Sequence, residues 1–137
     1  MPTYRETSGE SMNEIHNQSS GSPQIDTLKP EVSFEEFTKL DLRVGLILEA
    51  TRVPKSDKLI ELRVDLGIES RTILAGIGKV YEPEFLIHKQ IVVIANLAPR
   101  MLMGKESRGM VMAASGQDSL PLLLEAPIGA KPGQVIR

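Results

Sequence analysis

The strictest pattern in this chain is the alternation of apolar and charged residues in LIELRVDLG (residues 59–67). On an extended strand, Ile60, Leu62, Val64 and Leu66 point to one face, and the three charged residues between them point to the other. Such a strand is buried on one side only. The pattern therefore predicts a sheet that covers a core with one face and meets solvent with the other.

The neighbouring segments supply further strands. LRVGLILEATRV (42–53) is rich in β-branched and aliphatic residues and predicts a long strand, whereas PKSDK (54–58) predicts a loop. RTILAG (71–76) follows the turn at 67–70 and predicts a third strand. Short connections between three strands favour an antiparallel meander.

The second half of the chain completes this pattern. YEPEFLIHK (81–89) suits a short helix, QIVVIANL (90–97) a fourth strand and MVMAAS (110–115) a fifth, with APRMLMGKESRG as the loop between the last two. Three strands, a short helix and two strands follow the element order of the OB-fold. We therefore expect an all-β, five-stranded OB-fold Greek-key barrel with short helices and a C-terminal β extension.

Two flanking segments lie outside this barrel. Residues 1–32 are polar, with two basic and five acidic side chains, and predict a disordered acidic leader or linker. The ordered domain is expected over 33–137, with the extension beginning at about 117. Its leucines need burial against the barrel or against another subunit. They are Leu120, Leu122, Leu123 and Leu124.

A short helix is expected where the ordered domain begins. Ser33 precedes Glu36 by three residues, which is the spacing of a capping box. Phe34 and Phe37 share one side of the turn and are expected to pack toward the core.

The composition excludes several classes of function. No run reaches the roughly 18 apolar residues of a membrane helix, and the N-terminus lacks the apolar stretch of a signal peptide. We therefore expect a cytoplasmic protein without a membrane partner. The chain has no cysteine, and His16 and His88 alone cannot assemble a metal site, so neither a metal nor a cofactor is expected.

Basic residues cluster in two loops. OB-folds hold oligonucleotides on the face of strands 2 and 3 and on the loops joining strands 1 to 2 and 4 to 5. The first loop contains Lys55 and Lys58, which suit phosphate contacts. The second supplies candidate phosphate and ribose contacts in Arg100, Lys105, Ser107 and Arg108.

The methionines beside these cations have three interpretations. Core packing is the simplest, and it suits Met112 best. A thioether copper site is chemically possible, but no cysteine or histidine stands near in sequence. The third is an exposed, polarizable platform for a sugar or base, for which Met110 beside Gly109 is the best candidate.

The motifs do not support catalysis. AGIGKV (75–80) resembles a phosphate-binding loop, but no Gly stands five positions before Gly78, and Val80 replaces the Ser or Thr that would hold magnesium. A tight turn is expected there. The serines have no neighbouring histidine and the carboxylates are scattered on solvent faces, so a non-catalytic binding module is expected.

Several motifs then occur in a characteristic order: DLRVG, SDKL, NLAPR and GMVMAA. With the segments around them they resemble, over about residues 33–137, the tRNA-binding OB domain of methionyl-tRNA synthetase C-termini and of free-standing dimeric tRNA-binding proteins. The resemblance implies structure-specific, largely sequence-independent binding to the outer corner of tRNA, usually by a homodimer. Lys58, Ser107 and Met110 stand at positions similar to ones that contact tRNA in the family. Weaker carry-overs are Arg43, Lys55, Arg100 and Arg108.

The chain departs from this family pattern around the second loop. Met101, Leu102 and Met103 follow APR where family members often have basic residues, and Arg108 stands where they often have an acidic one. His88 also occupies a position where many have Gly. The cations of the loop are relocated in this chain.

A function follows from the residues and the resemblance together. We expect a tRNA-binding module that assists aminoacylation, as a domain or a partner of a methionyl-tRNA synthetase, by dimeric capture of tRNA. The alternative is a chaperone that binds unfolded polypeptide on a similar barrel. A third possibility is a purely dimerising appendix of a synthetase.

Overall fold

Three antiparallel strands form the first half of the barrel in the computed structural model, which describes residues 27–116 and 119–137. They are β1 (Leu42–Arg52), β2 (Ile60–Asp65) and β3 (Ser70–Ala75). The alternation predicted for β2 is confirmed, because Ile60, Leu62 and Val64 are completely buried. The register between β1 and β2 shifts after Ile47, and this irregularity allows β1 to bend around the core.

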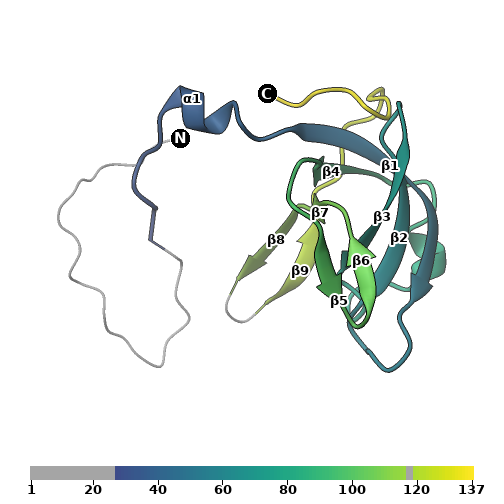
Figure 1. Ribbon diagram of the computed structural model, residues 1–137. Coiled ribbons are helices and arrows are strands. Elements are labelled where there is room, and N and C mark those ends of the chain that lie inside the picture. Colours follow the sequence, from purple (N-terminus) through teal and green to yellow (C-terminus); the bar gives the residue numbers. More distant parts are fainter. Residues whose placement is uncertain (1–26, 117–118) are drawn as a thin grey trace.

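Two further strands extend this sheet. β4 (Gln90–Ile94) pairs with the other edge of β1, and β7 (Met110–Val111) pairs with β4. The strand order is β3-β2-β1-β4-β7. The backbone N–H of Arg108 donates to the carbonyl of Thr72 at 2.9 Å, so the two edges of the sheet approach each other and the barrel is nearly closed (Figure 1). The predicted all-β, OB-like barrel is confirmed.

The connection predicted as a loop between strands four and five is a hairpin. It consists of β5 (Arg100–Leu102) and β6 (Lys105–Ser107), which pair with each other. The predicted fifth strand is divided, because its first part, β7, pairs with β4, whereas β8 (Ala113–Gly116) pairs with β9 (Ser119–Leu123). The change of partner near Met112 separates the two parts. β9 lies within the segment expected as the C-terminal extension, whereas β8 begins within the predicted fifth strand.

The helix α1 (Phe34–Phe37) begins at the predicted capping box. The Ser33 hydroxyl accepts from the backbone N–H of Glu36, and the Glu36 carboxylate accepts from the backbone N–H of Ser33. The expected burial of the two aromatic rings is wrong, because Phe34 is 76% exposed and Phe37 is 36% exposed. The helix has a single turn and lies outside the barrel, before β1 (Figure 1), so its rings face each other instead.

The helix predicted at 81–89 is limited to the 3-10 turn η2 (Pro83–Phe85). Leu86 follows it and is completely buried. His88 then adopts a φ of +76°, which ends the helical conformation, and its N–H donates to the carbonyl of Ile47 at 2.8 Å. This backbone conformation is one that Gly adopts most easily. The departure from the family pattern at His88 therefore falls on a strained position.

The C-terminal segment returns to the barrel. Ile136 donates its backbone N–H to Leu42, and Val44 donates its own to Gln134, so the segment pairs with the start of β1. Of the four leucines in the extension, only Leu123 is buried within this chain, where its N–H donates to the Tyr81 hydroxyl. Three remain exposed: Leu120, Leu122 and Leu124.

The expected leader falls mainly on residues 1–26, which lie outside the described part of the chain. Residues 27–32 have no helix or strand and are exposed. Within 27–116 and 119–137, none of the helices has the length and apolar character needed to cross a membrane.

Candidate nucleic-acid interface

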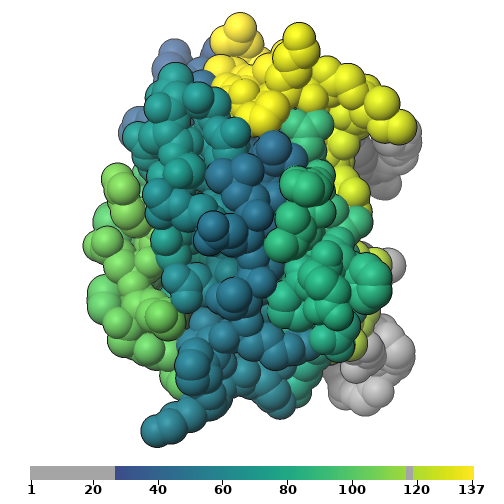
Figure 2. Space-filling view, turned by 90° about the vertical axis from the view of Figure 1, so that its right-hand side faces the viewer, coloured from purple at the N-terminus to yellow at the C-terminus, as the bar shows by residue number. Residues whose placement is uncertain are grey.

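A polar groove runs over the outer face of β2 and β3 beside the β5–β6 hairpin. The hairpin, drawn in green, lies along one side of the teal strands (Figure 2). Four cations and two carboxylates contribute to the walls, which gives the groove a positive balance. The lining residues are Glu61, Arg63, Ser70, Arg71, Thr72, Lys105, Glu106 and Arg108. The expected ligand face of an OB-fold is therefore polar and cationic in this chain.

Ser107 attaches the hairpin to the barrel. Its side chain is 4% exposed, and its hydroxyl accepts from the backbone N–H of Leu74 at 2.9 Å and donates to the carbonyl of Gly109 at 3.3 Å. Lys105 adds an ion pair, because its Nζ lies 3.3 Å from Oε1 of Glu61. Ser107, which sequence reasoning assigned to ligand contact, thus holds the wall of the groove through its own hydroxyl.

We predict that Ser107→Ala destabilises the domain. The substitution leaves the buried N–H of Leu74 without a partner, which costs about 1–3 kcal/mol of unfolding free energy. Urea denaturation at neutral pH measures this loss, and Ser115→Ala, at an exposed position, makes the same chemical change as a control. Equal unfolding free energies for the two variants would contradict a structural role for the hydroxyl.

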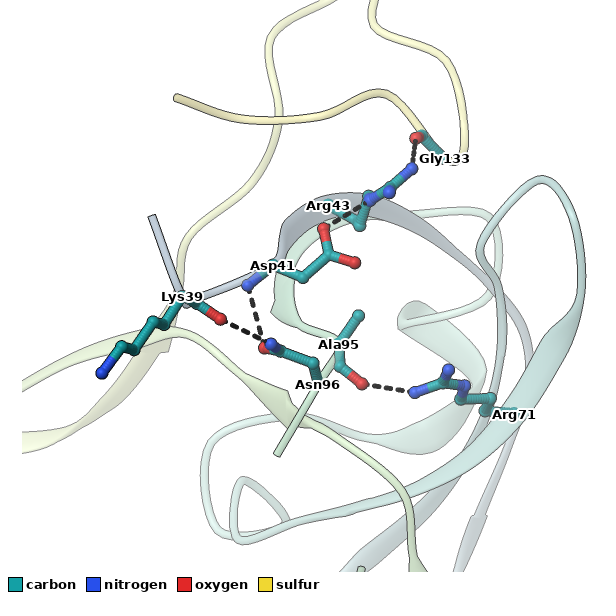
Figure 3. A network of polar contacts seen from close by, with 7 residues as sticks. All are labelled: Lys39, Asp41, Arg43, Arg71, Ala95, Asn96 and Gly133. Carbon is teal, nitrogen blue, oxygen red and sulfur yellow. Dashed lines mark hydrogen bonds and ion pairs between the residues drawn. The ribbon is translucent and has the colours of Figure 1, made fainter. Parts of the chain in front are cut away.

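Arg71 is fixed by contacts across the chain. Its guanidinium donates to the carboxylate of Glu69 and to the backbone carbonyl of Ala95, the second of which is drawn in Figure 3. The hydrogen bond from Arg71 and its charge hold the pKa of Glu69 below the ordinary value, with a smaller effect from the charge of Arg108. Glu69 is therefore ionised at neutral pH and offsets the charge of Arg71.

Other cations near the groove keep their charge available. Arg63 donates to the Thr72 hydroxyl at 3.2 Å and has no carboxylate partner among the described residues. Arg100, which is exposed at the start of β5, and Arg108 also have no carboxylate partner among the described residues. An unpaired guanidinium at a surface is free to contact phosphate. We conclude that Arg63 and Arg108 are the two groove cations available to a ligand.

The lysine loop (residues 53–59, between β1 and β2) carries two more exposed cations. Lys55, with a φ of +69°, and Lys58 form no ion pair within the described part of the chain. The loop projects at the lower end of the barrel in both views (Figures 1 and 2). The hairpin reaches the same end, because Lys105 pairs with Glu61 near the start of β2. The hairpin therefore borders the groove, and the loop with Lys55 and Lys58 lies near the same end of the barrel, beyond the residues that line the groove.

The turn in AGIGKV (75–80), the segment that resembles a phosphate-binding loop, contacts the backbone of Lys58. The N–H of Gly78 donates to the carbonyl of Lys58 at 2.7 Å, and the carbonyl of Gly78 accepts from Arg52 at 3.1 Å. A Cβ on Gly78 would lie 3.0 Å from that Lys58 carbonyl. The glycine is thus needed for close approach of two backbones, and the predicted tight turn is present.

Arg43 does not join the groove. Its Nε lies 2.6 Å from the carboxylate of Asp41, and its Nη1 donates to the carbonyl of Gly133 at 3.0 Å (Figure 3). It stands at the start of β1, whereas the lysine loop follows the end of that strand. The structure therefore places Arg43 in the attachment of the C-terminal segment.

The methionines divide into two environments. Met112 is half-buried between the sheet and the extension. Met110, on β7, is 40% exposed, while Met101 and Met103, on the hairpin, are 65% and 54% exposed. Met110 is thus available to a ligand, as an exposed platform requires.

Sequence reasoning missed two of the four groove cations. Arg63 could have been found, because the alternation in β2 places it opposite the core on the face where OB-folds bind ligands. Arg71 carried no comparable signal, since its partners Ala95 and Arg108 are distant in sequence.

A nearly closed five-stranded barrel with a cation-lined groove over its second and third strands is the arrangement of OB-type ligand-binding domains. A comparison with family models matches residues 42–135 to the family described as putative tRNA binding domain. The chain belongs to this family.

Curated relatives of this chain include methionine–tRNA ligases. The methionine–tRNA ligase of Chloroherpeton thalassium is 54% identical over 89 residues, or 65% of this chain and 13% of that protein. The corresponding ligase of Parabacteroides distasonis is 44% identical over 110 residues, 80% of this chain and 16% of the ligase. The chain thus spans less than a fifth of the length of these curated relatives.

Among solved structures, a MetRS-related protein from Pyrococcus horikoshii matches with a TM-score of 0.76 and 34% identity, covering 80% of this chain and 100% of that one. The chaperone CsaA from Bacillus anthracis matches with a TM-score of 0.72 and 31% identity, covering 79% and 100%. Synthetase-related and chaperone proteins therefore share this barrel.

Proposed function

We propose that this domain binds tRNA through its phosphate backbone and presents it for aminoacylation by a methionyl-tRNA synthetase catalytic domain, in the same chain or as a partner. The observation that carries the proposal is the set of unpaired cations around one groove, in a chain of the tRNA-binding family. Because the exposed cations stand on different elements, they fit a folded backbone better than a single phosphate. The module needs no chemistry of its own, and the process it serves lies in the cytoplasm.

The likeness in shape to a chaperone supports a second candidate, the binding of unfolded polypeptide. The exposed leucines of the extension would serve that role. The two candidates differ in salt dependence, because phosphate binding releases counterions and apolar binding does not. The cations of the groove favour tRNA.

We also propose that two copies of the chain associate through the outward face of the β9 segment. Leu120, Leu122 and Leu124 alternate along it and are 53%, 56% and 40% exposed, while Leu123 between them points into the core. A row of exposed leucines is an apolar surface that association would remove from water. Two grooves on one dimer would raise the affinity for RNA by effective concentration.

Titration with total tRNA at several salt concentrations tests the function. We predict that wild-type protein binds with an affinity that falls steeply with salt, and that Lys58→Ala lowers the logarithmic salt slope by about 1, because one phosphate contact is lost. Lys131→Ala, at an exposed position of the C-terminal segment, should leave the slope unchanged. Absence of a tRNA complex at low salt, or salt-insensitive binding of unfolded polypeptide instead, would contradict the proposal.

A further inference from the structure

The tip of the β5–β6 hairpin carries a residue that its backbone conformation does not favour. Leu102 pairs with Lys105, so Met103 and Gly104 form a two-residue turn, with φ values of +52° and +78°. Positive φ at both central positions is the pattern of a type I′ turn, in which Asn-Gly is preferred. A side chain such as that of Met103 adopts this conformation at an energetic cost. Local folding therefore does not account for Met103.

Core packing does not account for it either. Met103 is 54% exposed at the tip, and Met101 is 65% exposed on the strand that leads to it. Met101 pairs with Glu106, so it lies on the hairpin face opposite to that of Lys105 and Ser107, which contact the barrel. Two thioether side chains thus project from the rim of the groove with no packing role inside the described domain.

The surroundings of this tip indicate the chemistry of its partner. Cations line the groove behind it, and Lys105 at the base of the turn is paired with Glu61. A polynucleotide whose phosphates follow these cations presents ribose and bases within reach of the rim. Flexible, polarizable methionine side chains pack well on aromatic faces, and apolar side chains insert beside unstacked bases. Phosphate gains nothing from a thioether.

We propose that Met103, with Met101 beside it, forms a base-contact site that packs against an unpaired nucleobase of the bound RNA. The site rests on the proposed tRNA-binding function and adds an apolar contact to its phosphate contacts. The strained turn is retained because the thioether is needed at the tip.

Met103→Asn tests this assignment without endangering the fold, because Asn is favoured in the turn. The expected result is an affinity for total tRNA about threefold to tenfold lower than that of wild type, with the salt slope unchanged, since an apolar contact releases no counterions. Urea denaturation should show a domain at least as stable as wild type. Met101→Gln should give a smaller loss of affinity with the same unchanged slope.

The matched control is Ile68→Asn, which removes an exposed apolar side chain at the opposite end of β2 and should bind as wild type does. Base-specific chemical probing of saturated complexes should reveal an unpaired base that wild-type protein protects and Met103→Asn leaves reactive. Wild-type binding by Met103→Asn, a reduced salt slope, or the absence of such a base would each overturn the base-contact site while tRNA binding stands. Failure of wild type to bind tRNA at low salt would instead overturn the function itself.

Discussion

Replacing Arg63 and Arg108 together by Glu is expected to lower the affinity for tRNA by about 100-fold or more at moderate salt and to reduce the logarithmic salt slope by about 2. Both guanidinium groups border the groove and have no carboxylate partner in the described structure. The substitutions remove two phosphate contacts and place two negative charges in their positions. Equilibrium binding at four or more salt concentrations measures both quantities.

The fold should tolerate this double substitution. The side chain of Arg63 donates only to the exposed hydroxyl of Thr72, and Arg108 serves the hairpin through its backbone. Surface changes of this kind alter unfolding free energy by about 0.5 kcal/mol or less each. Lys39 and Lys131 replaced together by Glu make the same charge change away from the groove. An equal loss of affinity in this control would show that net charge, rather than the groove, governs binding.

Replacing Leu122 and Leu124 by Glu is expected to give a monomer whose tRNA affinity is about 10- to 100-fold below that of wild type, although no groove residue has changed. Both leucines lie on the outward face of the β9 segment, where a buried charge would oppose association. Analytical ultracentrifugation measures the mass, and tRNA titration measures the loss of bivalent binding.

A control variant and the mass of the wild-type protein test the proposed dimer further. Ile68→Glu places a charge at another exposed apolar position and should leave the mass unchanged. A wild-type protein that sediments as a monomer at micromolar concentration would show the dimer to be wrong, and the exposed leucines would then require another partner.

Much of the barrel could be predicted because its strands are amphipathic over five or more residues. The alternation from Ile60 to Leu66 sets which face of β2 is buried, and tertiary contacts do not override it. The β5–β6 hairpin was not predicted because each of its strands has only three residues. In addition, Met103 stands where an Asn before Gly would have indicated a hairpin turn. The division of the predicted fifth strand near Met112 depends on which strand pairs with each part, and local sequence does not determine that pairing.

The site was predictable in its location and less so in its details. The β5–β6 hairpin borders the groove over β2 and β3, on the face that OB-folds use for ligands, whereas the lysine loop lies at the end of the barrel near the start of β2. The hydroxyl of Ser107 and the guanidinium of Arg43 were read as ligand contacts because their residue types suit phosphate, but both are engaged by backbone groups. For Arg43 the partner Gly133 is 90 residues away in sequence, and only the closed fold brings it near.

That engagement of Arg43 has a consequence for solubility. β2 covers β1 only from Leu46 onward, so the backbone groups of Leu42–Val44 on that side would form an open strand edge. The C-terminal segment hydrogen-bonds to this edge, and Arg43 ties the segment down through Gly133. An open edge is a template on which strands of other chains add in register. By helping to hold the segment that covers this edge, Arg43 limits the backbone that is available for intermolecular β-sheet growth.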